Sequence, residues 1–293
     1  MDKQLMILPF DHRASFYRDI LGVLKPTAAD NKRVIELKNM VYDAFNKIRN
    51  KHLEQAEAFG ILVDEEYGTS ILKDAIKNKV TFLLTTEKSG QDEYKFEYGN
   101  AFGQHIKKFN PTFVKALVRY NPENKEINSK QLKRLKQLSD WCVKNKCQFL
   151  VELLVPPTEN DLKKVKTAKA FYNSDLRFNK TVKAIKEMRR VLKVDVWKLE
   201  GFNSAQWKSI VSAAGKRAKI IILGRGESEK QVLAWLKASA LYEQIVGFAI
   251  GRTIFEQPLK DYVNKQISKE KAVQQIAANY AKYVDIWLKL KNK

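Results

Sequence analysis

Short apolar runs recur along the whole chain, and polar turns bound each of them. A run of about six apolar residues is typical of a strand that is buried on both faces. The 293-residue sequence contains eight runs of this kind. They lie at Leu5–Phe10, Phe59–Val63, Val80–Thr85, Phe113–Val118, Gln148–Leu153, Val194–Leu199, Lys219–Leu223 and Ile245–Ile250.

Helical patterns separate these runs, with apolar residues at a spacing of three to four. The clearest are Lys32–Asn50, Lys130–Lys144, Phe178–Val191, Glu229–Ala240 and a C-terminal helix at Lys269–Leu290. Alternating strands and helices indicate a parallel sheet, and eight such units predict a closed (β/α)₈ barrel, also called a TIM barrel. A doubly wound open sheet is the alternative. Because such a barrel takes about 250 residues, we expect residues 1–293 to form a single domain.

The chain is strongly basic, with 54 Lys and Arg against 33 Asp and Glu and a net charge of +21. Such a balance can indicate nucleic acid, an anionic membrane surface or an acidic substrate as the partner. The lysines are spread along nearly every segment, however, and no run of five or six like charges occurs. This favours a solvated lysine-rich surface, so we expect no nucleic-acid partner.

The sequence also favours a cytoplasmic location. No stretch approaches the 18 or more apolar residues that span a membrane, and the N-terminal apolar run is too short for a signal peptide. Two cysteines, Cys142 and Cys147, do not make a disulfide framework, which fits a reducing compartment. We therefore expect no membrane partner. Barrel enzymes often form oligomers, but no stripe of residues in this sequence indicates an interface. A homo-oligomer is therefore left open.

Three charged residues interrupt the predicted strands: Lys115, Glu152 and Lys198. Burying a charge costs several kcal/mol unless it is paired, so each belongs to a network or to a site. A structural Lys115–Glu152 pair is the simpler alternative. Catalytic groups of such barrels lie at the C-terminal ends of the strands. Three ionisable groups that can all point into one barrel mouth favour a site.

The loops after the seventh and eighth runs carry Gly224-Arg225-Gly226 and Gly251-Arg252. In such barrels these two loops commonly hold a phosphate. Glycine lets backbone N–H groups approach the anion, and arginine offers a bidentate fork. Arg13, after the first run, could add a third cation. The sequence therefore predicts a phosphorylated substrate.

The expected reaction follows from a buried lysine, a neighbouring carboxylate and a phosphate site in one barrel mouth. An amine in a partly apolar pocket near other cations can attack a ketone and form a Schiff base. The protonated imine then withdraws electrons, so that a neighbouring carbon–carbon bond can break. We expect Lys198 to be this nucleophile and Glu152 to move the protons.

Other chemistries find less support. A metal-dependent aldolase needs clustered histidines or carboxylates, and of His12, His52 and His105 only His12 is expected at the barrel mouth. The chain has no GxSxG elbow, no P-loop and no Rossmann glycine fingerprint. We therefore expect neither a metal nor another cofactor.

Five blocks in order resemble a known family: ILPFDHRASF at 7–16, LVRYNPE at 117–123, FLVELLVPPT at 149–158, VWKLEG at 196–201 and IGRTIF at 250–255. Together they resemble the bacterial class I aldolase domain of myo-inositol catabolism, which is often fused behind a sugar kinase. The resemblance implies cleavage of 2-deoxy-5-keto-gluconate 6-phosphate to dihydroxyacetone phosphate and malonate semialdehyde. More distantly, the chain is similar to the tagatose 1,6-bisphosphate and sulfofructose phosphate aldolases.

The resemblance also implies roles for single residues. Lys198 matches the Schiff-base lysine, and Glu152 matches the acid/base glutamate beside it. Lys115 matches a lysine that contacts substrate oxygens. The further matches are the substrate positions Asp11 and Arg13, the phosphate-binding Arg252, and the stretches Asp64–Gly68 and Glu87–Gly90. The sequence places residues 65–68 in a loop after the second strand run.

Two departures from the family pattern bear on the substrate. Ala14 stands where the first motif has glycine, which alters the backbone close to the substrate. The kinase domain is absent from the sequence, and an aldolase module without it can act on a different substrate.

These observations together predict a Schiff-base aldolase that acts on a phosphorylated ketose or keto sugar acid. Lys198 and Glu152 are the expected catalytic residues. The expected substrate-binding residues are Asp11, Arg13, Glu87, Lys115 and Arg119. The expected phosphate-binding residues are Gly224, Arg225, Gly226, Gly251 and Arg252. Another phosphosugar barrel enzyme, such as an isomerase, and a non-catalytic polyanion-binding protein are the alternatives.

Overall fold

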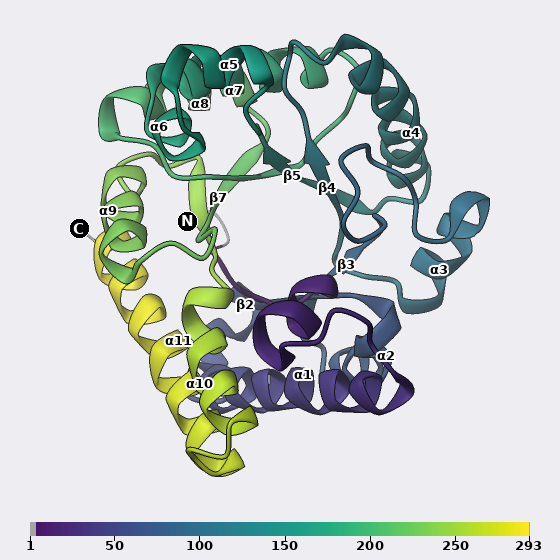
Figure 1. Ribbon diagram of the computed structural model, residues 1–293, viewed down its shortest axis with the longest axis vertical. Coiled ribbons are helices and arrows are strands. Elements are labelled where there is room, and N and C mark those ends of the chain that lie inside the picture. The colour runs from purple at the N-terminus through teal and green to yellow at the C-terminus, as the bar shows by residue number, and fades with distance from the viewer. Residues whose placement is uncertain (1–3, 293) are drawn as a thin grey trace.

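Eight parallel strands form one closed barrel in the order of the chain, and β8 pairs with β1. The computed structural model describes residues 4–292 (Figure 1). The strands are β1 (Leu5–Pro9), β2 (Phe59–Val63), β3 (Thr81–Thr85), β4 (Phe113–Arg119), β5 (Gln148–Leu154), β6 (Val196–Leu199), β7 (Lys219–Leu223) and β8 (Ile245–Ala249). The predicted (β/α)₈ barrel is thereby confirmed, and each strand lies within two residues of its predicted run.

Helices surround the strands as an outer ring (Figure 1). They are α1 (Ala28–Arg49), α2 (Glu65–Lys77), α3 (Phe102–Phe109), α4 (Lys125–Lys144), α5 (Glu159–Val165), α6 (Ala168–Tyr172), α7 (Asp175–Arg189), α8 (Ser204–Ala214), α9 (Glu229–Ser239), α10 (Arg252–Val263) and α11 (Lys269–Lys291). Shorter helical segments lie at Phe16–Leu21, Leu53–Ala58 and Gly99–Ala101. No helix within residues 4–292 has the length and apolar character needed to cross a bilayer.

Capping residues explain where several helices start. The predicted helix at Lys32 begins earlier, at Ala28, because Thr27 and Asp30 form a capping box. Asp175 likewise starts α7 because the Ser174 side chain accepts the N–H of Arg177. Such a cap satisfies one backbone donor that would otherwise lack a partner at the helix start.

Two segments read as loops or turns in the sequence are helical. Residues 65–68, expected as a loop, form the first turn of α2, because the Asp64 side chain accepts the N–H of Tyr67 and Glu65 and Glu66 suit the helix N-terminus. Arg252, expected in a turn, is the first residue of α10. Neither correction moves a residue away from the C-terminal end of its strand.

The barrel interior is filled in layers. Inward-facing apolar side chains form a separate core cluster that includes Phe113 of β4, Leu150 of β5 and Val196 of β6. Side chains alternate along a strand with period two, so the residues two positions later also point inward, one layer nearer the C-terminal ends. Those residues are Lys115, Glu152 and Lys198. The strand geometry itself thus brings the three charges together above an apolar floor.

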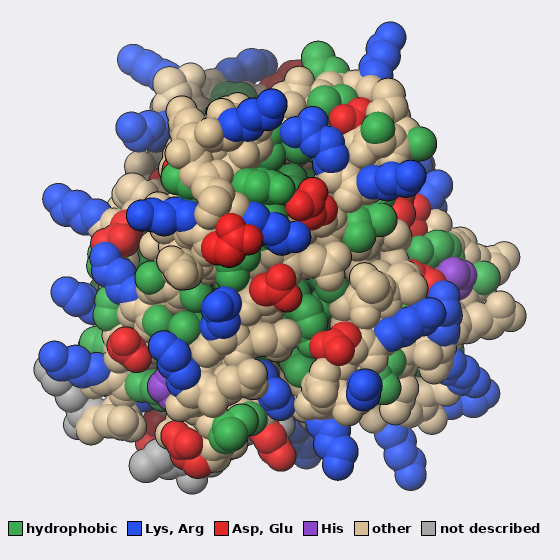
Figure 2. All heavy atoms as spheres, turned by 90° about the horizontal axis from the view of Figure 1, so that it is seen from below, with side chains coloured by type: hydrophobic (Ala, Val, Ile, Leu, Met, Phe, Trp, Pro, Cys, Tyr) green, Lys and Arg blue, Asp and Glu red, His purple; other side chains and the backbone are tan. Residues whose placement is uncertain are grey.

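The basic side chains show no single concentration on the surface in view. In Figure 2 the lysines and arginines are scattered over the visible face and interleaved with acidic and neutral residues. This arrangement fits the solvated surface expected from the sequence.

Candidate active site

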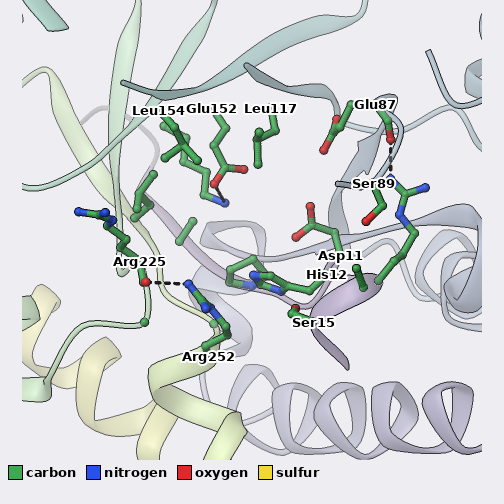
Figure 3. Close-up of a pocket in the computed structure, with 18 of the residues that line it drawn as sticks. Asp11, His12, Ser15, Glu87, Ser89, Leu117, Glu152, Leu154, Arg225 and Arg252 are labelled. Carbon is green, nitrogen blue, oxygen red and sulfur yellow. Dashed lines mark hydrogen bonds and ion pairs between the residues drawn. The ribbon is translucent and has the colours of Figure 1, made fainter. Parts of the chain in front are cut away.

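A cavity of about 310 Å³ opens at the C-terminal ends of the strands. Its wall draws on the ends of β1, β3, β4, β5, β6, β7 and β8 (Figure 3). All twelve predicted site residues line it. They are Asp11, Arg13, Glu87, Lys115, Arg119, Glu152, Lys198, Gly224, Arg225, Gly226, Gly251 and Arg252.

Lys115 is the centre of a buried ion cluster. Its Nζ lies 2.9 Å from Asp11 Oδ2, 2.5 Å from Glu87 Oε1 and 3.0 Å from Glu152 Oε2, and the residue is 1% exposed. Burial alone would lower the pKa of Lys115, but the three carboxylates outweigh burial and raise that pKa well above its usual value. Lys115 is therefore an ammonium ion at neutral pH.

Lys198 shares one of these carboxylates. Glu152 of β5 and Lys198 of β6 are directly opposite in the strand register, and Lys198 Nζ lies 2.9 Å from Glu152 Oε1. Glu152 thus stands between two ammonium groups. Burial would raise the pKa of Glu152, but Lys115 and Lys198 together hold it below its usual value. Glu152 is consequently a carboxylate that can accept a proton.

Asp11 and His12 follow β1 on the same wall. Burial would raise the pKa of Asp11, but Lys115, His12 and Lys198 hold it well below its ordinary value. For His12, burial together with the charges of Arg252 and Lys198 lowers the pKa to about 4 despite the nearby Asp11 charge. The imidazole is therefore neutral at pH 7. Its Nδ1 has no hydrogen-bond partner within the described part of the chain.

His12 should make the folded protein sensitive to acid. The unfolded chain binds a proton on this residue near pH 6.5, whereas the folded chain does so only near pH 4. The contribution of His12 to folding stability is therefore fully present above pH 6.5 and is lost as the pH drops towards 4. Between pH 7 and pH 4.5 we expect this group to remove roughly 2 kcal/mol from the free energy of unfolding.

Urea unfolding of the wild type and of His12→Asn at both pH values checks this expectation. On acidification from pH 7 to pH 4.5, the free energy of unfolding of His12→Asn should fall by roughly 2 kcal/mol less than that of the wild type. Equal losses in the two proteins would show that the folded state tolerates the protonated imidazole.

The end of the cavity where the sequence predicts a phosphate lies between the loops after β7 and β8. Arg252 Nη2 donates a hydrogen bond to the backbone oxygen of Arg225 at 2.7 Å. Gly226 has φ +77°, and a Cβ there would lie 2.9 Å from Arg252 Cζ. A side chain at position 226 would therefore push against the Arg252 guanidinium.

Arg225 itself is oriented differently from the sequence-based expectation of a guanidinium on the phosphate. Its side chain extends away from Arg252, and only its carbonyl meets that residue (Figure 3). Its Nε lies 3.0 Å from Glu200 Oε1, and its Cζ lies 3.2 Å from the centre of the Tyr172 ring.

The two remaining predicted arginines differ in how their charge is matched. Arg13 is buried, and its guanidinium donates to Glu97 Oε2 and to the backbone oxygen of Glu87, both at 2.5 Å. Arg119, at the end of β4, donates to the backbone oxygen of Gln91 at 2.8 Å. The charge of Arg13 is thus paired with a carboxylate, whereas the guanidinium of Arg119 donates to a neutral carbonyl.

Sequence reasoning missed several residues of the wall. They are Pro9, Ser15, Arg18, Leu117, Leu154, Leu223 and Ala249. Leu117 and Leu154 lie two residues after Lys115 and Glu152 on the same strands, so the period-two pattern could have found them. Ser15 and Arg18, which follow the first strand, carry no periodic signal. His12, Ala14 and the stretch Glu87–Gly90 line the cavity, as the sequence had suggested. Within residues 4–292 no group of three or more His, Cys, Asp or Glu is placed to hold a metal.

Comparison with known proteins gives a family and a fold. A family model described as "Uncharacterized protein conserved in bacteria (DUF2090)" matches residues 1–291. No curated protein matches the chain in sequence.

Two solved structures are similar over nearly the whole chain. One is the protein Cgl0159 from Corynebacterium glutamicum, with a TM-score of 0.61, 15% identity and coverage of 96% of this chain and 87% of that one. The other is a Schiff base forming fructose-1,6-bisphosphate aldolase, with a TM-score of 0.53, 15% identity and coverage of 94% of each chain. At this identity the likeness shows a common fold.

Proposed function

The chain belongs to the DUF2090 family, and from this premise we propose that it is a class I aldolase that cleaves a phosphorylated ketose or keto sugar acid through a Schiff base on Lys198. The observation that carries the proposal is the pair formed by Lys198 and Glu152 on the cavity wall, with 2.9 Å between Nζ and Oε1. A Schiff base needs an amine beside a proton acceptor, and this pair supplies both. The shared fold with a Schiff base forming aldolase supports the same chemistry.

The surroundings of the two lysines favour Lys198 over Lys115 as the nucleophile. A lysine must lose a proton before its nitrogen can attack a carbonyl carbon. Lys115 is held as an ammonium ion by three carboxylates, so it is poorly suited to do this. Lys198 lies against the Glu152 carboxylate, which can take its proton. Lys115 is better suited to fix Asp11 and Glu152 and to donate hydrogen bonds to substrate oxygens.

The catalytic cycle follows from this pair. The Lys198 amine passes its extra proton to Glu152 and attacks the ketone carbon of the substrate. Glu152 returns that proton to the former carbonyl oxygen, which leaves as water, so that a protonated imine remains and Glu152 is again a carboxylate. Glu152 then removes the proton of the hydroxyl group on the second carbon from the imine carbon. The bond between this hydroxyl-bearing carbon and the carbon next to the imine breaks, its electron pair moves into the imine to give an enamine, and an aldehyde leaves. Protonation of the enamine and addition of water release the ketone product and restore the amine.

The ends of the cavity suggest how the substrate lies. Arg252 and the glycines at 224, 226 and 251 would hold a phosphate at the β7–β8 side. Arg119 lies on β4, which is four strands from β8 and therefore across the barrel. Its guanidinium could pair with a carboxylate at the far end of a sugar acid. This arrangement favours 2-deoxy-5-keto-gluconate 6-phosphate as the substrate, in line with the sequence resemblance, with dihydroxyacetone phosphate and malonate semialdehyde as products.

Borohydride trapping tests the proposed function directly. The full-length protein is incubated with dihydroxyacetone phosphate and sodium borohydride in the presence of EDTA, and intact mass and peptide mapping follow. We expect one covalent adduct, on Lys198, because borohydride reduces the imine to a stable secondary amine. Lys198→Arg is the matched control, since it keeps the positive charge but cannot form an imine. Folded wild-type protein without an adduct, or with its adduct on another lysine, would contradict the proposal.

A further inference from the structure

The turn between β7 and α9 has a backbone that suits glycine better than arginine. The N–H of Glu227 donates to the Gly224 oxygen at 3.0 Å, which closes a four-residue turn. Its central residues, Arg225 and Gly226, both have positive φ, at +56° and +77°. Glycine adopts this region at no steric cost, whereas a residue with a Cβ does so at a cost. Contacts elsewhere must therefore hold Arg225 in place.

Those contacts come from outside the cavity wall. Glu200, which follows β6, lies 3.0 Å from Arg225 Nε, and Tyr172, the last residue of α6, stacks on the guanidinium at 3.2 Å. A stacked arginine keeps its planar group fixed in one orientation. The two groups line a second cavity, of about 400 Å³, that borders the first one at Arg225.

Arg177 of α7 fixes both partners of Arg225. Its Nη1 lies 3.2 Å from Glu200 Oε2, and its Nε donates to the backbone oxygen of Tyr172 at 2.8 Å. Its Nη2 also donates to the Gly201 oxygen at 3.0 Å. Glu200 and Arg177 are 4% and 7% exposed, so this network is well shielded from water. Glu200 and Tyr172 are therefore rigid supports.

The opposite side of the same turn meets Arg252. The Arg225 carbonyl accepts a hydrogen bond from Arg252 Nη2 at 2.7 Å, and the missing side chain of Gly226 leaves room for that guanidinium. A continuous set of contacts thus runs from Tyr172 and Glu200 through the Arg225 backbone to Arg252. A change in the first two residues should alter where Arg252 sits.

We propose that Glu200 and Tyr172 are positioning residues for phosphate binding: they hold Arg225 so that its carbonyl orients Arg252 towards the phosphate, while the Arg225 guanidinium does not touch the phosphate. The inference rests on the proposed function only in placing a phosphate beside Arg252. It assigns control of phosphate affinity to the connection between β5 and β6, which carries Tyr172 and Arg177.

Phosphate binding to Tyr172→Ala and Tyr172→Phe distinguishes this positioning role from direct phosphate binding by the Arg225 guanidinium. Inorganic phosphate is titrated into the full-length proteins and followed by calorimetry. Loss of the stacked ring should weaken phosphate binding about threefold, as expected for one lost cation–π contact. Tyr172→Phe keeps the ring and should bind phosphate like the wild type. If the Arg225 guanidinium were itself a phosphate ligand, releasing it from Tyr172 would strengthen binding, and that result would overturn the proposal.

Glu200→Gln extends the test to the ion pair. This variant should weaken phosphate binding about tenfold, because a charge-assisted contact to Arg225 is lost. Its thermal midpoint is measured first, because Arg177 also depends on Glu200. Should it not fold, the Tyr172 pair decides the question, since Tyr172 is only partly buried.

A kinetic comparison separates positioning from general damage. In borohydride trapping, Tyr172→Ala should raise the concentration of dihydroxyacetone phosphate needed for half-maximal labelling but leave the maximal rate unchanged. Labelling by unphosphorylated dihydroxyacetone should be unaffected. Equal losses with both ketones would overturn the positioning role. If no protein forms an imine but phosphate binding changes as expected, the proposed aldolase function is refuted and the positioning role stands. If the wild type shows no saturable phosphate binding, the positioning role is refuted.

Discussion

Replacement of Lys198 by alanine is expected to reduce turnover by at least about 10⁴-fold, because the proposed nucleophile is removed and the buried Lys115 is held as an ammonium ion by three carboxylates. The variant should still fold. Glu152 keeps the Lys115 ammonium at 3.0 Å and is not left as an unpaired buried charge. The lost side chain lines an open cavity, so its removal enlarges that cavity and leaves no sealed void in the core.

The measurement is the rate of aldehyde release from 2-deoxy-5-keto-gluconate 6-phosphate, together with the thermal midpoint of each protein. Lys198→Arg serves as the charge-preserving control and should be equally inactive. A Lys198→Ala protein that does not fold would assign a structural role to the residue. Residual activity of two-thirds or more would exclude the Schiff base on Lys198.

The position of the site could be predicted because it depends on strand periodicity. Lys115, Glu152 and Lys198 each interrupt an apolar run, and period two places all three inside the barrel once the strands are known. The barrel order then brings β4, β5 and β6 side by side. Both steps use only the sequence spacing and the closure of the sheet.

Side-chain direction in the loops could not be predicted in this way. The GRG pattern at 224–226 suggested an arginine fork on the phosphate, whereas the Arg225 guanidinium reaches Glu200 and Tyr172 instead. Tyr172 comes from a connection whose short helices give no strong periodic signal, and Glu200 directly follows β6. Arg13 is a similar case, because its partner Glu97 lies 84 residues away in a segment without a regular pattern.

The carboxylates around Lys115 bear on the stability of the fold, whereas Lys198 bears on activity. Asp11, Glu87 and Glu152 all lie within 3.0 Å of the Lys115 ammonium and are all largely buried. Carboxylates gathered around one group repel one another strongly where water is excluded. The Lys115 ammonium, in contact with all three, offsets this repulsion.

Lys115→Met is therefore expected to lower the free energy of unfolding at pH 7 by roughly 3–5 kcal/mol, the usual cost of leaving buried charges without their partner. Lys133→Met, on the exposed side of α4, is the matched control and should change stability little. Urea unfolding followed by tryptophan fluorescence gives the free energy of each protein. Stability of Lys115→Met equal to that of the wild type would show that the carboxylates do not depend on this cation.

The carboxylates' contribution to the pH dependence should change sign in Lys115→Met. In the wild type the folded state lowers the pKa of Asp11 and Glu152, so these groups stabilise the fold above their unfolded pKa values near 4 and lose that effect as the pH falls. Without Lys115, burial and mutual repulsion should instead raise both pKa values above those of the unfolded chain. Both proteins lose stability through His12 between about pH 7 and pH 5, but the variant should lose less than the wild type, because protons that neutralise the cluster offset this loss. A variant that loses as much stability as the wild type over this range would show that the carboxylates find another cation, and Lys198 is the group placed to supply it.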